Sequence, residues 1–345
     1  MTVTPLLIRF LVSALVIVLA GTWLARSGDV IAARTKLGGV WVGSVLLALA
    51  TSLPELATDI AAVRMGAPDL AAGDLFGSTM ANMLILAIVS LVPSGTELFR
   101  KAALDHVLYA SLAILLTVIA AITVLARPTT TVAGVGAGSL LLIVTYAVGS
   151  RAAFRHGSLA REAGLTVEMS VAEAPAAESH ALPEARSLRR AIVTFAAAAL
   201  VILVAAPQFA RSAEGVATVT GIGTTVVGTW LVGLATSLPE LVTSLAAVRL
   251  RAYDLAVGNL FGSNALNMTI FPVLDVVHGR GPVLGVVSPV HALTALVDIA
   301  LMAVAVAALV YRARGKVALL EPSSALIIIG YVAGLALIFS QAVGR

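Results

Sequence analysis

The chain contains no cysteine, and charged residues make up only 12% of its 345 residues. Without thiols the protein can form neither disulfides nor thiolate metal sites. A soluble domain carries about a quarter charged residues, so this scarcity of charge argues against a soluble fold. Lysine is also rare, because only three of the 22 basic residues are lysines. Few lysines beside abundant Ala, Val, Gly and Arg indicate a bacterial, GC-rich genome.

Apolar residues are what the sequence has in abundance. They make up 59% of the chain, and the mean hydropathy is +1.03. A membrane-spanning helix needs about 20 mostly apolar residues. Ten stretches meet this requirement, and they begin near Pro5, Gly39, Asp69, Ala103, Thr130, Ala191, Thr218, Asp254, Pro282 and Pro322. The sequence therefore predicts an all-α integral membrane protein with ten transmembrane helices, and the lack of period-two alternation disfavours a barrel.

A polar segment from 152 to 190 separates the first five stretches from the last five. It is rich in Ala, Glu and Arg, and it lacks the pattern of an EF-hand calcium loop. We interpret residues 1–151 and 191–345 as two five-helix halves, and the segment as a solvated linker. Its glutamates could instead attract cations, but solvation explains them more simply. The first stretch resembles a signal peptide in that Arg9 precedes an apolar run, yet it is long for that role.

The distribution of basic residues predicts the orientation in the membrane. With the N-terminus outside, 16 of the 22 Lys and Arg residues fall in inside loops and 6 fall outside, as the positive-inside rule requires. Both termini are then outside and the linker is cytoplasmic, in a bacterial inner membrane. This distribution explains the basic charge by topology, so we expect a lipid bilayer and no nucleic acid as a partner.

One segment occurs twice, at 46–86 and at 231–271, with a constant offset of 185 residues. Of the 41 aligned positions, 26 are identical, and both copies contain Ala-Thr-Ser-Leu-Pro-Glu. Because each half has five spans, an odd number, the second copy must cross the membrane in the opposite direction. Secondary transporters use such inverted repeats to form a site at the midplane. A duplication kept only for packing would not require a buried acid in both copies.

The proline of each copy predicts a broken helix at the midplane. Pro54 has no N–H, so the carbonyl of Ala50 loses its partner within the helix. Pro239 has the same effect on the carbonyl of Ala235. Broken helices occur at membrane depth only where the freed backbone is covered by protein or faces water. A freed carbonyl there can bind a cation.

Every candidate ligand in the two copies offers oxygen. Glu55 and Glu240 each follow a threonine at spacing i, i+4, which places both side chains on one helix face. The other candidate ligands of the two copies are Thr51, Ser52, Ser78 and Asn82, and Thr236, Ser237, Ser263 and Asn267. Oxygen ligands with a formal charge of −2 suit hard cations such as Ca²⁺ or Na⁺. A protonated, structural role is the alternative for a single buried glutamate.

These motifs resemble the α-repeats of the sodium/calcium exchangers, within the calcium/cation antiporter superfamily. The first copy continues with Gly-Asp-Leu-Phe-Gly-Ser-x-x-x-Asn, and the second continues with Gly-Asn-Leu-Phe-Gly-Ser-Asn-x-x-Asn. The resemblance implies a prokaryotic member with two inverted five-helix repeats. It also implies alternating access, in which the first and sixth helices slide past the other eight.

The resemblance further implies roles for residues at matching positions. Glu55 and Glu240 would be central ligands shared by Ca²⁺ and Na⁺, with Asn82 and Asn267 completing the centre. Flanking and outer oxygens would come from Thr51, Thr236, Ser78, Ser263 and the carbonyls of Ala48 and Gly233. No cofactor is expected, because Ca²⁺ and Na⁺ are the transported ions.

The sequence departs from the family pattern at several positions. Ala50 and Ala235 replace the usual glycine, and Asn267 replaces the aspartate of potassium-dependent members, which argues against potassium dependence. The Gly-Asn-Glu signature of the proton-coupled branch is missing from both copies. These features favour sodium coupling.

The two copies also differ from each other in acidity. Asp59 aligns with Ser244, and Asp74 aligns with Asn259. We expect Asp59 to be solvated near a helix end, with a place in an outer vestibule as the alternative. Asp298 has no acidic counterpart in the first half, and we expect it to be a buried, hydrogen-bonded acid.

The function that follows is antiport rather than enzymatic catalysis. We expect inward Na⁺ gradients to drive Ca²⁺ out of the cell, because both ions compete for the same carboxylates. Exchange of Ca²⁺ for H⁺ at these carboxylates is the alternative within the same class. A cation channel, or a structural or sensor protein, are alternatives from other classes, and a channel would need no exchanging ion.

Overall fold

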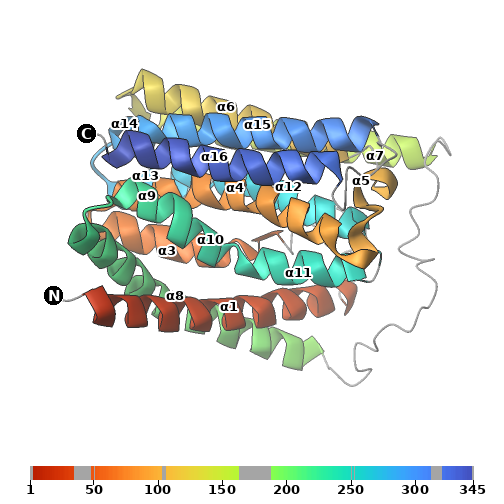
Figure 1. Cartoon of the computed structure of the whole chain (residues 1–345), viewed down its shortest axis with the longest axis horizontal. Coiled ribbons are helices and arrows are strands. Elements are labelled where there is room, and N and C mark those ends of the chain that lie inside the picture. Colours follow the sequence, from red (N-terminus) through yellow and green to blue (C-terminus); the bar gives the residue numbers. More distant parts are fainter. Residues whose placement is uncertain are drawn as a thin grey trace.

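The computed structural model is a helical bundle whose long helices run roughly along one direction (Figure 1). It describes residues 3–34, 48–49, 51–102, 106–162, 188–249, 251, 253–311 and 321–343. Among the described residues, the only strands are β1 (Thr131–Val132) and β2 (Val135–Gly136), which form one short antiparallel hairpin. The all-helical architecture expected from the sequence is therefore confirmed.

The first half begins with α1 and ends with the long helix α7. Its helices are α1 (Val3–Arg34), α3 (Leu53–Arg64), α4 (Pro68–Leu91), the short turns η1 (Pro93–Gly95) and α5 (Leu98–Lys101), α6 (His106–Ala126) and α7 (Ala137–Glu162). Prolines at the first turns of α3 and α4 suit helix starts, because the missing N–H has no partner there in any case.

The second half repeats this order, and α11 is the counterpart of α3. Its helices are α8 (Leu188–Thr220), α9 (Thr224–Val227), the π-helical segment η2 (Gly228–Val232), α10 (Gly233–Thr236), α11 (Leu238–Arg249), α12 (Tyr253–Met268), α13 (Phe271–His278), α14 (Val283–Val286), α15 (Val290–Tyr311) and α16 (Pro322–Val343). The chain bends by 41° between Thr236 and Leu238, directly before Pro239. This is the broken helix that the sequence predicts.

Each of the ten predicted spans has a helical counterpart, although not every counterpart is long. Within the part of the chain that the structure describes, seven helical segments are long and apolar enough to cross a membrane, and the bent pair before and after Ser237 makes an eighth. In α7 the apolar part covers only Ala137–Ala153. The span predicted to begin near Gly39 lies mostly outside the described residues, and α3 forms its end.

Large apolar side chains cover the outside of the bundle. Leu11 on α1 and Val204 on α8 are 63% and 68% exposed in the protein alone. Soluble proteins rarely expose large contiguous apolar surfaces, so these faces suit lipid. The first predicted span corresponds to the long helix α1, which packs along α8.

The two halves run in opposite directions. Figure 1 shows α3 running toward one end of the bundle and α11 toward the other. Both chain ends lie at one end of the bundle, and the end of α7 and the start of α8 lie at the opposite end. Helices of the linker segment are described only for residues 152–162 and 188–190, as extensions of α7 and α8.

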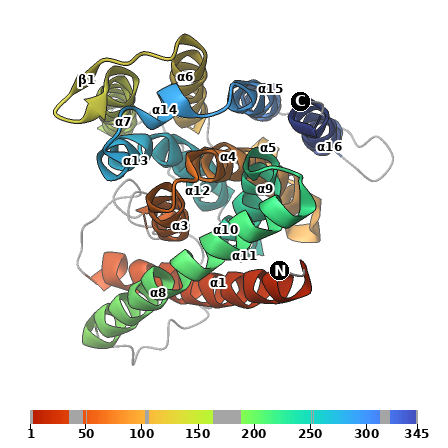
Figure 2. The same cartoon turned by 90° about the vertical axis from the view of Figure 1, so that its left-hand side faces the viewer.

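The helices form three layers around a polar centre. The long helices α1 and α8 pack against each other along one side, as both views show (Figures 1 and 2). The middle layer holds α3, α4, α10, α11 and α12, and the opposite side holds α6, α15 and α16. The two repeated segments, 46–86 and 231–271, therefore supply the middle of the bundle.

Candidate functional site

The two repeated glutamates lie in the first turns of α3 and α11, where each broken helix restarts. Glu55 is 1% exposed and Glu240 is 0% exposed. Each carboxylate lies near a helix N-terminus, whose partial positive charge favours an anion. The two carboxylates are also close enough to interact electrostatically with each other and with Asp74. The inverted repeat thus brings two acids, 185 residues apart in the chain, to one place in the middle layer.

Hydroxyl groups connect the two repeats on one side of these glutamates. The Ser78 hydroxyl donates to the carbonyl oxygen of Gly233 at 3.2 Å and lies 3.1 Å from Oγ1 of Thr236. Thr236 in turn donates to Oδ1 of Asp74 at 2.8 Å. The carboxylate of Glu55 lies near the same threonine. Four predicted site residues from the three helices α3, α4 and α10 therefore meet here.

The pseudo-symmetric contact is present on the other side. Oγ1 of Thr51 and Oγ of Ser263 are 3.5 Å apart, and Thr51 donates to the carbonyl oxygen of Ala48 at 3.3 Å. Both hydroxyls lie near the Glu240 carboxylate, although neither meets the geometry of a hydrogen bond to it. Each glutamate therefore faces a threonine from the opposite repeat. Ala50, whose carbonyl was expected to be freed, lies outside the described residues.

An asparagine layer continues the polar centre. The side-chain amide of Asn82 donates to Oδ1 of Asn264 at 2.8 Å, and Asn264 donates to the backbone carbonyl of Thr79 at 3.3 Å. The side chain of Asn267 is 1% exposed and none of its polar atoms has a hydrogen-bond partner among the described residues. Asn82 and Asn267 are thus both buried, but only Asn82 is held in place.

Many oxygens of this centre are buried without a donor. They are Oγ of Ser52 and Ser237, Oε2 of Glu55, both carboxylate oxygens of Glu240, Oδ2 of Asp74 and Oδ1 of Asn82 and Asn267. A buried polar group without a hydrogen bond costs about 1–3 kcal/mol, and more when it is charged. A bound cation would satisfy several of these oxygens at once, so the donor set fits a hard cation.

Carboxylates alone do not complete this site. Within the described residues, no three Asp, Glu or His side chains come close enough together to hold a metal ion by themselves. A cation between Glu55 and Glu240 would therefore also need hydroxyl, amide and carbonyl oxygens. The serines, threonines and asparagines of the two repeats supply those groups.

Glycines allow the middle helices to approach closely. A Cβ atom on Gly77 of α4 would lie 2.2 Å from the carbonyl oxygen of Thr229, and one on Gly233 would lie 2.7 Å from the carbonyl carbon of Gly77. Thr229 belongs to the π-helical segment η2, and such segments are frequent at functional sites. This contact brings Ser78 within reach of the Gly233 carbonyl.

The expectation for Asp59 is wrong. Its side chain is 0% exposed, so it is not solvated, although it lies late in α3. The reason is that α4 folds back over this face of α3 and brings Asp74 against Asp59. Asp74 is also fully buried.

Asp298 on α15 is buried, as expected, but it is not well hydrogen bonded. It is 0% exposed and faces Thr79 of α4. Neither carboxylate oxygen meets the geometry of a hydrogen bond among the described residues. The predicted burial is confirmed, and the predicted hydrogen bonding is not seen.

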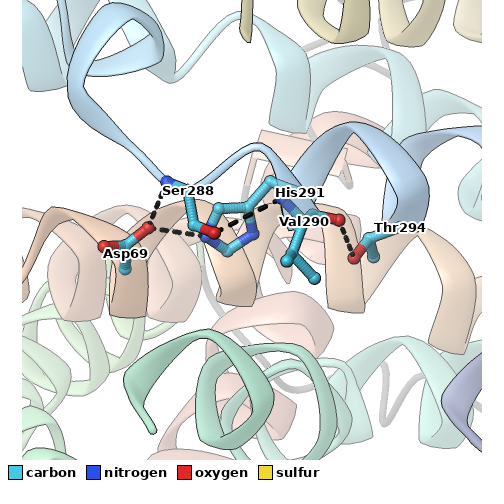
Figure 3. Close-up of polar contacts among 5 residues, drawn as sticks. All are labelled: Asp69, Ser288, Val290, His291 and Thr294. Atoms are coloured by element: carbon cyan, nitrogen blue, oxygen red, sulfur yellow. Dashed lines mark hydrogen bonds and ion pairs between the residues drawn. The ribbon is translucent and has the colours of Figure 1, made fainter. Parts of the chain in front are cut away.

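Two aspartate–histidine pairs flank the centre, and the sequence analysis missed both. Oδ1 of Asp69 lies 3.0 Å from Nε2 of His291 and accepts a 2.6 Å bond from the backbone N–H of Ser288 (Figure 3). The pseudo-symmetric pair joins Asp254 to His106, also at 3.0 Å. Each pair links the start of α4 or α12 to the corresponding helix of the opposite half. Their common offset of 185 residues was the available signal.

Asn264 is the other residue that the sequence analysis did not single out. It stands in the Gly-Ser-Asn part of the second motif, and it replaces Thr79 of the first copy. A departure from the repeat at a buried position was therefore the signal for its bridging role.

The fold and this centre define a class: a multi-span membrane transporter with a cation-type site between two inverted repeats. The sequence profile of the family "Sodium/calcium exchanger protein" matches residues 5–150 and 190–340. The chain therefore belongs to this family. It is a cation-exchanger family transporter in a membrane, not an enzyme.

Individual relatives agree with this assignment. The chain is 28% identical over 271 residues to the inner membrane protein YrbG of Escherichia coli, which covers 75% of this chain and 76% of YrbG. It is 39% identical over 77 residues to the sodium/calcium exchanger MaX1 of Methanosarcina acetivorans, a match that covers 22% of each protein.

Solved structures of two exchangers share the fold. The sodium-calcium exchanger NCX_Mj superposes with a TM-score of 0.61 at 21% identity, over 97% of this chain and 99% of that chain. The H⁺/Ca²⁺ exchanger CAX superposes with a TM-score of 0.68 at 17% identity, over 98% of this chain and 85% of that chain. At these identities the likeness concerns the fold alone.

Proposed function

We propose that this protein is an antiporter that exchanges Na⁺ for Ca²⁺ by alternating access and extrudes Ca²⁺ from the cell. The observation that carries the proposal is the pair Glu55 and Glu240. Both are buried, both belong to inverted copies of one motif, and both keep carboxylate oxygens without donors. Two carboxylates can be neutralised by one Ca²⁺ or by several Na⁺, so binding of one ion excludes the other.

The surrounding oxygens support the same ions. We infer that the ligands beside the glutamates are Thr51, Ser52, Ser78, Asn82, Thr236, Ser237, Ser263 and Asn267, with the carbonyls of Ala48 and Gly233. Hydroxyl, amide and carbonyl oxygens suit hard cations and are poor ligands for Zn²⁺ or Cu²⁺. The missing Gly-Asn-Glu signature and the local identity to MaX1 favour Na⁺ over H⁺ as the coupling ion.

Exchange of Ca²⁺ for H⁺ is the second candidate. The fold of the H⁺/Ca²⁺ exchanger CAX superposes on this chain, and a buried carboxylate can exchange a proton for a metal ion. Under this candidate, a pH gradient would drive Ca²⁺ flux in the complete absence of Na⁺.

The test is ⁴⁵Ca²⁺ uptake into proteoliposomes with imposed Na⁺, K⁺ or H⁺ gradients. An outward Na⁺ gradient should drive Ca²⁺ uptake, whereas a K⁺ gradient or a channel-type leak should not. Glu55→Gln and Glu240→Gln should each reduce this uptake to the level of protein-free vesicles, because one carboxylate cannot balance the charge of Ca²⁺. Glu97→Gln is the control, since Glu97 pairs with Arg100 at an exposed turn. Normal uptake in both glutamate variants would refute the site assignment.

The proposed orientation can be tested separately. We infer that the halves 1–151 and 191–345 flank a cytoplasmic linker at 152–190 and that both termini face the periplasm. Because the chain has no cysteine, single cysteines in the linker and near the C-terminus should report their sides unambiguously. A membrane-impermeant maleimide should label intact spheroplasts at the C-terminus and not in the linker.

A further inference from the structure

The two halves differ where α3 meets α4 and where α11 meets α12. In the second half, the side-chain amide of Asn259 donates to Oγ1 of Thr243 at 3.1 Å and to Oγ of Ser244 at 3.4 Å. This contact is neutral. At the aligned positions of the first half, both polar residues are carboxylic acids, Asp74 and Asp59. The first half therefore has two acids at positions where the second half has two neutral residues.

The acid pair is buried and lacks donors. Asp59 and Asp74 are both 0% exposed, and among the described residues neither forms an ion pair with Lys, Arg or His. Oδ1 of Asp74 accepts bonds from Thr236 at 2.8 Å and from Ser78 at 3.2 Å. Oδ2 of Asp74 and both oxygens of Asp59 have no donor. Two carboxyl groups in this state must be neutralised, by a bound cation or by a proton, because burial of unpaired charge is costly.

The pair adjoins the proposed exchange site without being part of its symmetric ligand set. Asp59 lies one helical turn after Glu55 on α3, and Asp74 lies one turn before Ser78 on α4. Asp59 and Asp74 are within electrostatic range of each other, and Asp59 is also within range of Glu55. The pair therefore lies between Glu55 and the turn that joins α3 to α4.

We propose that Asp59 and Asp74 bind one further hard monovalent cation, Na⁺ under the proposed function, beside the ions at Glu55 and Glu240. The pair has three buried carboxylate oxygens without a donor, two from Asp59 and one from Asp74. A monovalent ion suits it better than a second divalent ion, because Ca²⁺ at the adjacent glutamates would repel another double charge strongly at this depth. The second half has no equivalent, since Ser244 and Asn259 carry no charge.

The test is the double variant Asp59→Ser with Asp74→Asn, which installs the residues of the second half. Na⁺ and Ca²⁺ binding are measured separately, on purified protein in nanodiscs, by isothermal titration calorimetry and by ion-dependent thermal stabilisation. We expect the number of Na⁺ ions bound to fall by about one and the number of Ca²⁺ ions bound to stay the same. Thermal stabilisation is the second readout, because an ion that binds the folded state stabilises it. Asp298→Asn is the control, because it removes a buried acid elsewhere in the bundle.

The outcomes separate this proposal from the proposed function. Unchanged Na⁺ stoichiometry in a folded double variant would overturn the cation site and favour a proton shared by the two acids. Loss of a Ca²⁺ instead of a Na⁺ would overturn the monovalent assignment. The single variants Asp59→Ser and Asp74→Asn provide the same measurement if the double variant does not fold. If the wild type binds the additional Na⁺ but shows no Na⁺-driven Ca²⁺ flux, the exchange function fails and the cation site stands.

Discussion

Asn264 shows how a single buried amide can organise the proposed ion site. Its carbonyl oxygen accepts from Asn82, and its amide donates to the backbone of α4 at Thr79. Both bonds cross between the two repeats. Asn82 is thereby held with its own oxygen, Oδ1, free of any donor, which is the state that a cation ligand needs.

Replacing Asn264 by alanine should therefore weaken both the fold and the site. We expect a loss of about 1–2 kcal/mol in stability, because an interhelical bond is lost and the Asn82 amide is left without an acceptor. The half-saturation concentration for Ca²⁺ should rise as well. Thermal unfolding and Ca²⁺ titration measure the two effects. Thr117→Ala is a suitable control, since among the described residues the Thr117 hydroxyl bonds only its own helix, at Ala113. Equal effects of the two variants would contradict the role of Asn264.

At the residue scale, the sequence predicted the site residues that occur in both copies of the repeat. Glu55 and Glu240 stand out because a carboxylate beside proline occurs twice in apolar surroundings. Asp59 was misjudged because its position late in a short helix suggests solvent, whereas burial there depends on how α4 folds back over α3. The aspartate–histidine pairs involve residues 148 and 222 positions apart, and one sequence does not show that they meet.

At the element scale, the close approach of α4 to η2 depends on glycine. A Cβ at position 77 would meet three backbone atoms of Thr229 within 2.7 Å. Backbone atoms of two packed helices cannot move aside as the end of a flexible side chain can. The distance between the helices, and with it the contact of Ser78 with Gly233, therefore requires glycine at position 77.

Gly77→Ala should accordingly abolish transport and lower thermal stability, by about 1–3 kcal/mol or more. Intrinsic helix propensity acts in the opposite direction, since alanine is about 1 kcal/mol better than glycine in a helix. Gly330→Ala is the matched control, because its Cβ would meet only the end of the Leu301 side chain. Size-exclusion profiles, melting curves and ⁴⁵Ca²⁺ uptake compare the two variants. Wild-type behaviour of Gly77→Ala would mean that α4 can retreat from η2.

The aspartate–histidine pairs are a second feature at this scale. In Figure 3, Asp69 at the start of α4 reaches both the backbone N–H of Ser288 and the ring of His291. The ring is fully buried and stacks near Phe76. The pair therefore fixes α15 of one half to α4 of the other.

A double-mutant cycle with Asp69→Asn and His291→Ala should reveal this coupling. We expect the two single losses of stability not to add, with a coupling of about 1 kcal/mol, as is usual for interhelical polar pairs and partly exposed ion pairs. Thermal unfolding of the four proteins provides the measurement. The same cycle with Asp254→Asn and His106→Ala should give a similar value, and strictly additive losses in both cycles would show that the pairs contribute nothing.

At the scale of the whole molecule, α1 and α8 form a layer apart from the other helices. They contact each other along their lengths, with the rings of Phe10 and Phe209 stacked at 4.7 Å. Among their contacts to the remainder, Ala57 on α3 belongs to the same buried apolar cluster as Ala198 and Ile202 on α8. An apolar interface of small residues permits sliding, which is the motion that the family resemblance implies.

Cross-linking can test this motion, and the absence of cysteine in the chain makes the experiment clean. Joining Ala57→Cys on α3 to Ile202→Cys on α8 with a short bismaleimide should stop Ca²⁺ exchange, because the layer is tied to the rest. Joining Phe10→Cys to Phe209→Cys should leave exchange intact, because both helices move together. Uptake before and after cross-linking gives the answer. Full activity of the first cross-linked pair would exclude sliding at this interface.

The polar contacts between the halves are reciprocal: Asp69 meets His291 and Asp254 meets His106, while Ser78 meets Thr236 and Ser263 meets Thr51. Each pair maps onto the other when 185 is added to or subtracted from its numbers. This is the signature of an isologous interface, in which one surface binds a second copy of itself. A half-length chain that inserted in the membrane in both orientations could form all four contacts as a homodimer. The present chain corresponds to such a dimer joined into one chain, and in a joined chain each half can carry residues that the other lacks, as the first half carries Asp59 and Asp74.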